Sequence, residues 1–228
     1  QEQYCKPKEL RIKNLVEELQ ISSGRPNEFN ICNQLFEEYK YFQYDSAYVY
    51  ARKLESFANK SGKRTDAAIA QAALLFCYKS VGFFNEALEI IRNFRPEEVP
   101  DEILVNFYTL CASTYQNLSS YVYGTQYLAE KYNKKVLEYY KLALKYASDY
   151  TFYYHWISLE IALIQEYSDE LAIDGRKNLI GLFNLDEHQL AVQYSILANA
   201  CDSKQQHQEA TYYRAVSAIY DIKSCVHE

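Results

Sequence analysis

Apolar residues recur along most of the chain at intervals of three and four, which is the spacing of one face of an α-helix. In residues 8–20 this face holds Leu10, Ile12, Leu15, Val16 and Leu19. The same pattern predicts further helices, in chain order, over 28–42, 45–59, 64–80, 85 to 94, 101–119 and 132–147. No segment alternates with the two-residue period of a half-buried strand over a comparable length, so the pattern predicts an all-α protein.

Short polar breaks separate these predicted helices. The segment 22–27 reads Ser-Ser-Gly-Arg-Pro-Asn, Gly62 and Gly82 each end a helix, and Pro96 and Pro100 punctuate the chain before the helix at 101. Glycine (6) and proline (4) are otherwise scarce in the 228 residues, whereas a β-sandwich or barrel needs many turns. The connections are therefore short, and the helices they join are expected to pair as antiparallel hairpins.

The hairpin around Gly82 carries a recognisable set of residues. Tyr78 lies in the last turn of the first helix, Gly82 ends it, Phe84 follows in the turn, and Ala87 and Ile91 lie one turn apart in the second helix. A small side chain at Ala87 allows the two helices to approach closely where they cross. This arrangement resembles the tetratricopeptide repeat (TPR), in which paired helices stack into a right-handed superhelix, an α-solenoid.

The alanine anchor recurs at Ala47, Ala172 and Ala210, although the spacing of 40, 85 and 38 residues (87 − 47, 172 − 87 and 210 − 172) is longer than a standard repeat. The 85-residue gap accommodates one further hairpin, with a tyrosine-rich insert at 120–131 that we expect to form a loop. We therefore predict an N-terminal helix and linker over 1–27 and one array of five degenerate TPR-like hairpins over 28–228.

A closer resemblance is carried by three stretches. Residues 35–47 (LFEEYKYFQYDSA), the tyrosine-rich segment 115–132 and residues 215–222 (AVSAIYDI) are similar to a family of Bacteroidetes membrane-linked regulatory proteins. The family implies a signal peptide and a TPR-like region, followed by a membrane span, a coiled coil and a C-terminal part assigned to DNA binding. By this resemblance the chain is the periplasmic input region of an inner-membrane regulator, and the membrane is reached through a segment outside it.

Composition agrees with that placement. The chain contains no methionine, even at position 1, so Gln1 is not a translational start; removal of a secretory signal peptide or a trimmed boundary both account for it. The net charge of −6 and the absence of any run of more than two basic residues argue against direct contact with nucleic acid. No apolar stretch reaches the roughly 18 residues of a membrane span.

No catalytic or metal-binding pattern is present in the sequence. The four histidines are not spaced with one another or with cysteine as metal ligands, and glycine-rich phosphate loops and nucleophile elbows are absent. We therefore expect no enzyme activity, no cofactor and no metal. Of the six cysteines, Cys32, Cys77, Cys111 and Cys201 fall in apolar helical contexts and are expected to be buried thiols. An oxidising compartment would allow Cys5 to pair with Cys32 or with Cys225.

Two sets of residues are candidates for ligand binding. In a TPR array the first helix of each pair lines the concave surface, and its exposed side is expected to carry Phe36, Tyr39, Phe76, Lys79, Ser113 and Gln116. The second set lies in the tyrosine-rich insert, where exposed aromatic side chains suit recognition, and comprises Tyr121, Tyr123 and Tyr127. The alternative for this second set is that the insert folds back and buries them.

Two functions fit these observations. The first is a non-catalytic sensor or scaffold domain that binds a protein, a peptide or a small ligand in the periplasm and passes the event to a transcriptional regulator beyond Glu228. The second is a free-standing TPR-like accessory protein, a scaffold or a component of polysaccharide uptake, with no membrane-linked regulator. A cytoplasmic location is the alternative to a periplasmic one.

Overall fold

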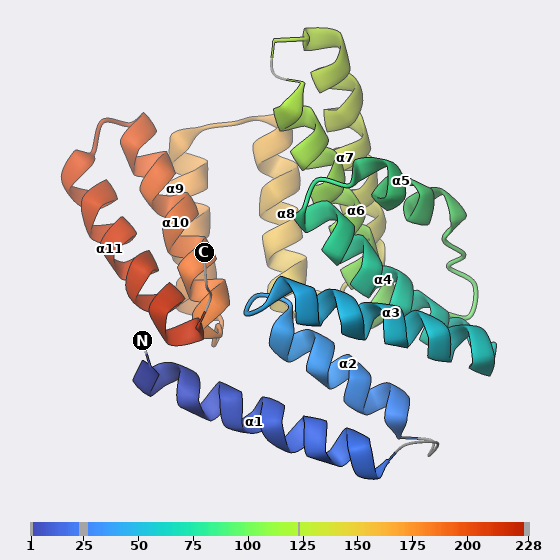
Figure 1. Cartoon of the computed structure of the whole chain (residues 1–228). Coiled ribbons are helices and arrows are strands. Elements are labelled where there is room, and N and C mark those ends of the chain that lie inside the picture. The colour runs from blue at the N-terminus through green and yellow to red at the C-terminus, as the bar shows by residue number, and fades with distance from the viewer. Residues whose placement is uncertain (1, 23–26, 123, 226–228) are drawn as a thin grey trace. The chain divides into compact units, whose positions relative to one another are not determined.

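The computed structural model describes residues 2–22, 27–122 and 124–225. Those residues form eleven α-helices and no strand (Figure 1). In chain order the helices are α1 (Glu2–Ile21), α2 (Glu28–Tyr39), α3 (Tyr44–Ser61), α4 (Arg64–Ser80), α5 (Phe84–Asn93), α6 (Asp101–Tyr121), α7 (Gln126–Tyr146), α8 (Phe152–Gln165), α9 (Asp169–Leu182), α10 (Glu187–Ser203) and α11 (His207–Ser224). The predicted all-α helical-repeat class is confirmed.

The chain divides into two compact units. One comprises Arg11–Ser148 and holds α2 to α7, and the other comprises Asp149–Glu228 together with Gln1–Leu10 and holds α8 to α11. Consecutive helices pack in pairs, α2 with α3, α4 with α5 and α6 with α7 in the first unit, and α8 with α9 and α10 with α11 in the second. The continuation of all five pairs as one array over 28–228 stays a prediction.

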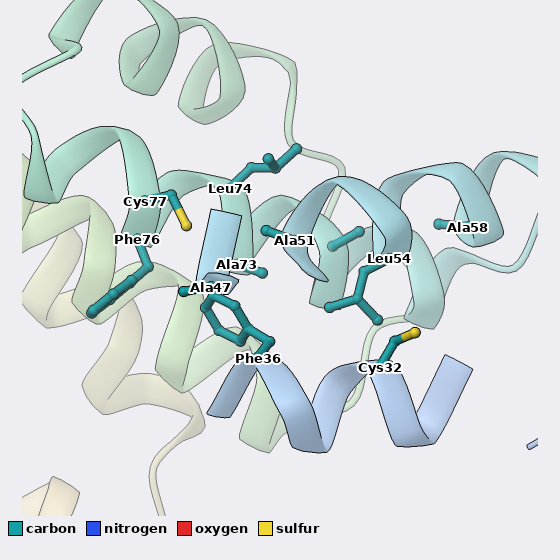
Figure 2. Packing of buried hydrophobic residues seen from close by; sticks show 11 residues of the cluster. Cys32, Phe36, Ala47, Ala51, Leu54, Ala58, Ala73, Leu74, Phe76 and Cys77 are labelled. Atoms are coloured by element: carbon teal, nitrogen blue, oxygen red, sulfur yellow. The ribbon is translucent and has the colours of Figure 1, made fainter. Parts of the chain in front are cut away.

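The core of the α2–α7 unit is built from small and large apolar side chains in alternation. Ala47, Ala51 and Ala58 line one side of α3, and Leu54 projects between them toward Cys32 and Phe36 of α2 and toward α4 (Figure 2). Ala47, Ala51 and Leu54 have no exposed surface. The alanines let three helix backbones approach closely, and Leu54 and Phe36 fill the space that remains.

The C-terminal half of α1 belongs to the same unit and packs on α2. Ile12 contacts Ile31 and Leu35, all three of them buried. At the rim of this contact, the Arg11 guanidinium lies 2.9 Å from the Glu38 carboxylate. This ion pair is largely solvent-exposed, so its contribution to stability is small beside that of the apolar contact.

Two helix pairs repeat the same turn at an interval of 123 residues (205 − 82 and 210 − 87). Gly82 and Gln205 both adopt left-handed backbone conformations, with φ of 78° and 61°. In both turns a backbone N–H bonds a carbonyl five residues earlier at 2.9 Å, from Phe83 to Tyr78 and from Gln206 to Cys201. Ala87 and Ala210 then lie in the first turn of the second helix, and neither has exposed surface. The alanine anchor predicted for these hairpins is present in both units.

A close helix approach also organises the α8–α11 unit. A Cβ atom added to Gly175 of α9 would lie 2.5 Å from Cδ1 of Leu159 in α8, so a larger residue there would displace the Leu159 side chain. Ala172 and Ile173 of α9 pack with Leu197 and Cys201 of α10 and with Ala210 of α11, in one apolar cluster.

Several helix boundaries differ from the sequence prediction. Helix α1 begins at Glu2 rather than near residue 8 and continues through Pro7. Helices α6 and α7 extend into the segment 120–131, so only residues 122–125 connect them. The prediction of a loop over 120–131 is therefore wrong.

Candidate ligand-binding surface

The structure places Phe36 and Phe76 in the core, so the prediction that they lie on an exposed side is wrong. Phe36 is 4% exposed and Phe76 9% exposed, and their rings meet edge to face with centroids 6.0 Å apart. The ring of Tyr41 packs on that of Phe76 in the same edge-to-face geometry, with centroids 5.3 Å apart. The sequence pattern could not separate the two faces of α4, because apolar residues surround that helix.

Three other predicted contact residues are occupied by internal partners. The half-buried ring of Tyr39 stacks on that of Tyr50 at 5.6 Å, and this burial raises the pKa of Tyr39. The Tyr140 hydroxyl donates to Oε1 of Gln116 at 3.2 Å, and the Ser113 hydroxyl donates to the Leu110 carbonyl at 3.4 Å. Tyr39 and Gln116 thus contact a neighbouring helix and Ser113 bonds within α6, and ligand contact by these three residues stays a prediction.

Lys79 stands apart from the other residues of this set. It is half-buried at the end of α4, with its ammonium 5.5 Å from the centre of the Phe76 ring. Among the described residues no carboxylate forms an ion pair with it. Desolvation lowers the pKa of Lys79, because burial penalises the charged form. A ligand that supplies a carboxylate or another anionic group would relieve this penalty.

The tyrosines at the α6–α7 connection are exposed, although they lie on helices. Tyr121 ends α6 and is 75% exposed, and Tyr127 lies in the first turn of α7 and is 74% exposed. The Tyr121 ring contacts Phe84 edge to face at 5.3 Å. Tyr123 lies outside the described residues. The structure therefore brings two aromatic rings to the surface at one end of this hairpin, and their role in binding stays a prediction.

Tyrosine pairs between neighbouring helices recur in the fold. Tyr115 of α6 stacks on Tyr139 of α7 at 5.6 Å, and Tyr194 of α10 stacks on Tyr220 of α11 at 5.8 Å. The rings of Tyr48 of α3 and Tyr78 of α4 have centroids 6.1 Å apart, and burial together with a hydrogen bond that the Tyr78 hydroxyl donates to Tyr48 raises the pKa of Tyr78 to about 12. Much of the tyrosine content thus serves helix pairing, as offset ring stacking is favourable beyond the area it buries.

The cysteines separate into one disulfide and four buried thiols. Cys5 of α1 and Cys225, which follows α11, are joined by a disulfide with their Cα atoms 5.5 Å apart. Of the two pairings left open by the sequence, the structure contains this one. Cys32, Cys77, Cys111 and Cys201 are free and buried. Burial raises the pKa of Cys32 to about 11 and that of Cys77 to about 12, so neither is a reactive thiolate near neutral pH.

A buried polar network in the α8–α11 unit escaped the sequence analysis. Arg176 of α9 is 2% exposed; its guanidinium forms an ion pair with Glu160 of α8 and donates to Oε1 of Gln193 of α10 at 3.0 Å. Its Nε has no hydrogen-bond partner. Arg176 lies on the same helix face as Ala172, Ile173 and Leu179, and that spacing was a signal of burial. The network links three helices, and we assign it a role in their register.

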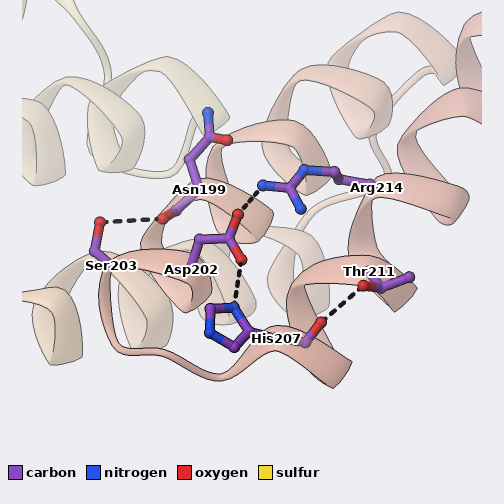
Figure 3. A network of polar contacts seen from close by, with 6 residues as sticks. All are labelled: Asn199, Asp202, Ser203, His207, Thr211 and Arg214. Carbon is purple, nitrogen blue, oxygen red and sulfur yellow. Dashed lines mark hydrogen bonds and ion pairs between the residues drawn. The ribbon is translucent and has the colours of Figure 1, made fainter.

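A second polar network joins α10 to α11 at the surface. The Asp202 carboxylate ion-pairs with Arg214 and lies 3.3 Å from Nδ1 of His207 (Figure 3). Arg214 and, to a lesser degree, His207 lower the pKa of Asp202. Thr211 and Ser203 bond backbone carbonyls of their own helices at 2.8 and 3.2 Å. The arrangement is that of a solvated helix pair, and it positions no side chain for chemistry on a substrate.

The described residues form neither a metal-binding cluster nor a membrane-spanning helix. Within them, no group of three or more His, Cys, Asp or Glu side chains is placed to hold a metal ion. None of the described helices combines the length and the apolar character required to cross a bilayer.

Antiparallel helix pairs with buried alanines such as Ala87 and Ala210 define a helical-repeat protein of the TPR type, a non-catalytic scaffold fold whose members generally mediate protein interactions. A family model described as the SusR N-terminal TPR domain matches residues 1–228. The chain therefore belongs to the family of SusR N-terminal TPR domains. No curated protein and no solved structure matches the chain.

Proposed function

We propose that the chain is the non-catalytic input domain of a transcriptional regulator, located in the periplasm and joined to the inner membrane through a segment outside these residues. The single observation that carries this proposal is the match of all 228 residues to the N-terminal domain of SusR, which is by description one part of a larger protein. The proposed role of this chain is to bind a protein or a peptide, and a small ligand is the alternative. The bound state is passed to the remainder of the regulator.

The disulfide supports the periplasmic location. Disulfides persist in secreted and periplasmic proteins, whereas the reducing cytosol keeps cysteines as thiols. The Cys5–Cys225 bond is buried, with Cys5 5% and Cys225 1% exposed, so it belongs to the folded core of the unit.

Counting thiols in protein taken from its natural source tests this location. Cells are quenched in acid, unfolded without reductant and treated with a maleimide that adds a fixed mass to each thiol. Periplasmic protein will gain four additions, because only Cys32, Cys77, Cys111 and Cys201 are free. A Cys225→Ser variant, which releases Cys5, will gain five. Six additions on the natural protein would favour the cytoplasmic alternative.

Within the proposed ligand surface, Lys79 is the residue that best fits contact with a partner. Its ammonium is half-buried, lies over an aromatic ring and lacks a carboxylate among the described side chains. An acidic side chain or the C-terminal carboxylate of a peptide would complete this arrangement, as charge-assisted hydrogen bonds are stronger in a partly desolvated setting.

A comparison of two lysine variants tests that contact. Lys79→Met removes the charge and keeps the length of the side chain. Lys60→Met is the matched control, because Lys60 also lies over a ring, that of Phe57 at 5.9 Å, but is exposed. Partners recovered from periplasmic extract by the natural sequence are expected with Lys60→Met and not with Lys79→Met. Equal recovery by both variants would remove Lys79 from the ligand surface.

A further inference from the structure

One face of α7 carries a row of lysines. At 100° per residue, Lys131, Lys134, Lys141 and Lys145 project within a narrow sector of the helix, together with Glu138 and Tyr127. All of these side chains are exposed. From Lys131 to Lys145 the row extends for roughly 21 Å along a single straight helix. These lysines form no run of adjacent basic residues in the sequence, because helical spacing places them three, four and seven positions apart.

The row lies in a net-positive part of an acidic chain. Residues 103–146 contain five lysines, no arginine and two glutamates, which gives +3 (5 − 2), whereas the whole chain carries −6 and the remainder therefore −9 (−6 − 3). Glu138 is ion-paired with Lys135 at 2.8 Å, and Glu130 accepts a hydrogen bond from Gln126 at 2.9 Å. The four lysines of the row form no ion pair with any described residue.

No acidic residue of the neighbouring helix faces the row. Helix α6 packs along α7, and its only carboxylates, Asp101 and Glu102, lie in its first turn. The rest of α6 is uncharged. The positive potential of the row is consequently not neutralised within its own hairpin.

The hairpin ends in exposed aromatic rings. Tyr121 and Tyr127 lie on either side of the connection between α6 and α7, 75% and 74% exposed. Tyrosine combines an apolar ring with a polar hydroxyl and is enriched where water meets lipid. The basic row and the aromatic end are parts of one continuous hairpin.

We propose that the lysine row of α7 docks on the surface of an anionic phospholipid membrane, with Tyr127 at the level of the head groups. Docking on an anionic lipid surface requires only positive charges that reach one plane, and a row of flexible lysine ammonium groups along one helix face provides them. A specific protein partner would use apolar or arginine anchors seated in pockets, and the row holds neither. Arginine is also the residue suited to two-pronged phosphate recognition, and residues 103–146 contain none.

Vesicle sedimentation tests the proposal with the whole chain. Vesicles of phosphatidylcholine alone are compared with vesicles in which one third of the lipid is phosphatidylglycerol, at about 0.05 M and about 0.5 M NaCl. The chain is expected to sediment with the anionic vesicles at low salt, and not with neutral vesicles or at high salt. Absence of sedimentation with anionic vesicles at low salt would overturn the proposal.

Charge-matched variants identify the surface. Lys134→Gln/Lys141→Gln/Lys145→Gln removes three charges from the row, and Lys53→Gln/Lys60→Gln/Lys63→Gln removes three exposed charges from α3 and its C-terminal end. Each lysine removed should lower the affinity for anionic vesicles about fivefold, so the first variant should bind them about 100-fold more weakly than the natural chain. The second should bind nearly as well. Equal weakening of both, or tighter binding of duplex DNA than of the vesicles, would refute docking of this face on lipid.

Discussion

Cys5 and Cys225, separated by 220 positions in the sequence, are covalently joined, and both are buried. The bond connects the first turns of α1 to the residue that ends α11, where the chain adopts a left-handed conformation with φ of 57°. A hydrogen bond from the Lys8 ammonium to the Ser224 carbonyl, at 3.4 Å, lies beside it. The disulfide is therefore the covalent closure of the unit that contains α8 to α11.

Loss of this disulfide should lower the free energy of unfolding considerably. The loop that it closes is almost the whole chain, and loop-closure entropy gives an upper estimate of about 5 kcal/mol. We expect Cys225→Ser to shift the urea unfolding midpoint downward. The natural protein in the presence of a strong reductant should show the same shift, while reductant should leave the variant unchanged. Coincident curves for oxidised protein and variant would contradict the prediction.

The four free thiols should not react with thiol reagents in the folded protein. Burial raises their pKa, to about 11 for Cys32 and about 12 for Cys77, so little thiolate exists at pH 8. With a chromogenic disulfide reagent, no thiol is expected to react within minutes under native conditions. Four are expected in denaturant and six after prior reduction. Fast reaction of any thiol in the native state would indicate that its helix pair opens.

Removing only one partner of the buried Arg176–Glu160 ion pair should lower the free energy of unfolding more than removing both. Arg176→Met leaves the Glu160 carboxylate without its cation in a mostly buried position, and such a loss costs about 3 to 5 kcal/mol. The double variant Arg176→Met/Glu160→Leu removes both charges and should recover at least half of that loss. Chemical unfolding of the two variants measures the difference. If the double variant were the less stable of the two, the charges would not be coupled in this way.

The alanine at the α10–α11 crossing should not tolerate a larger side chain. Ala210 has no exposed surface, so Ala210→Leu must displace α11 from α10, with an expected loss of about 1 to 3 kcal/mol. Ala218→Leu is the matched control, since Ala218 lies on the same helix and is exposed. Thermal unfolding should show a lower Tm for the first variant and nearly no change for the second. Similar Tm values would place Ala210 away from a tight crossing.

Alkaline pH should destabilise the protein through its stacked tyrosines. The pKa of Tyr78 is raised to about 12, against about 10 in an unfolded chain, and burial raises those of Tyr39, Tyr50 and Tyr115. Since the neutral form is favoured in the fold, this stabilisation is complete below pH 10 and is lost as pH rises toward 12. Absorbance near 295 nm, which reports tyrosine ionisation, should rise in two steps as the pH is raised. Exposed tyrosines ionise first, and the buried ones ionise as the helical circular dichroism signal falls. A single transition near pH 10 with retained helicity would refute the prediction.

Most of the helices could be predicted from local pattern, and the hairpin at Gly82 best of all. There the stop at Gly82 and the anchor at Ala87 are both as predicted, because a left-handed turn and a close crossing each impose a strict demand on one residue. The prediction of which residues are exposed was less accurate. Phe36 of α2 and Phe76 of α4 are core residues. For Phe76 the period could not say which side faces solvent, because α4 is apolar on nearly every side.

What the sequence by itself determined is therefore the repeating unit: helices of three-to-four periodicity, short connections and small residues where helices cross. Tertiary structure alone decided which cysteine pairs with Cys5 and that Arg176 is neutralised inside the core by Glu160. Local propensity depends on neighbours three or four positions away. Pairing, burial and surface potential depend on residues that lie far apart in the chain and meet only when the helices pack.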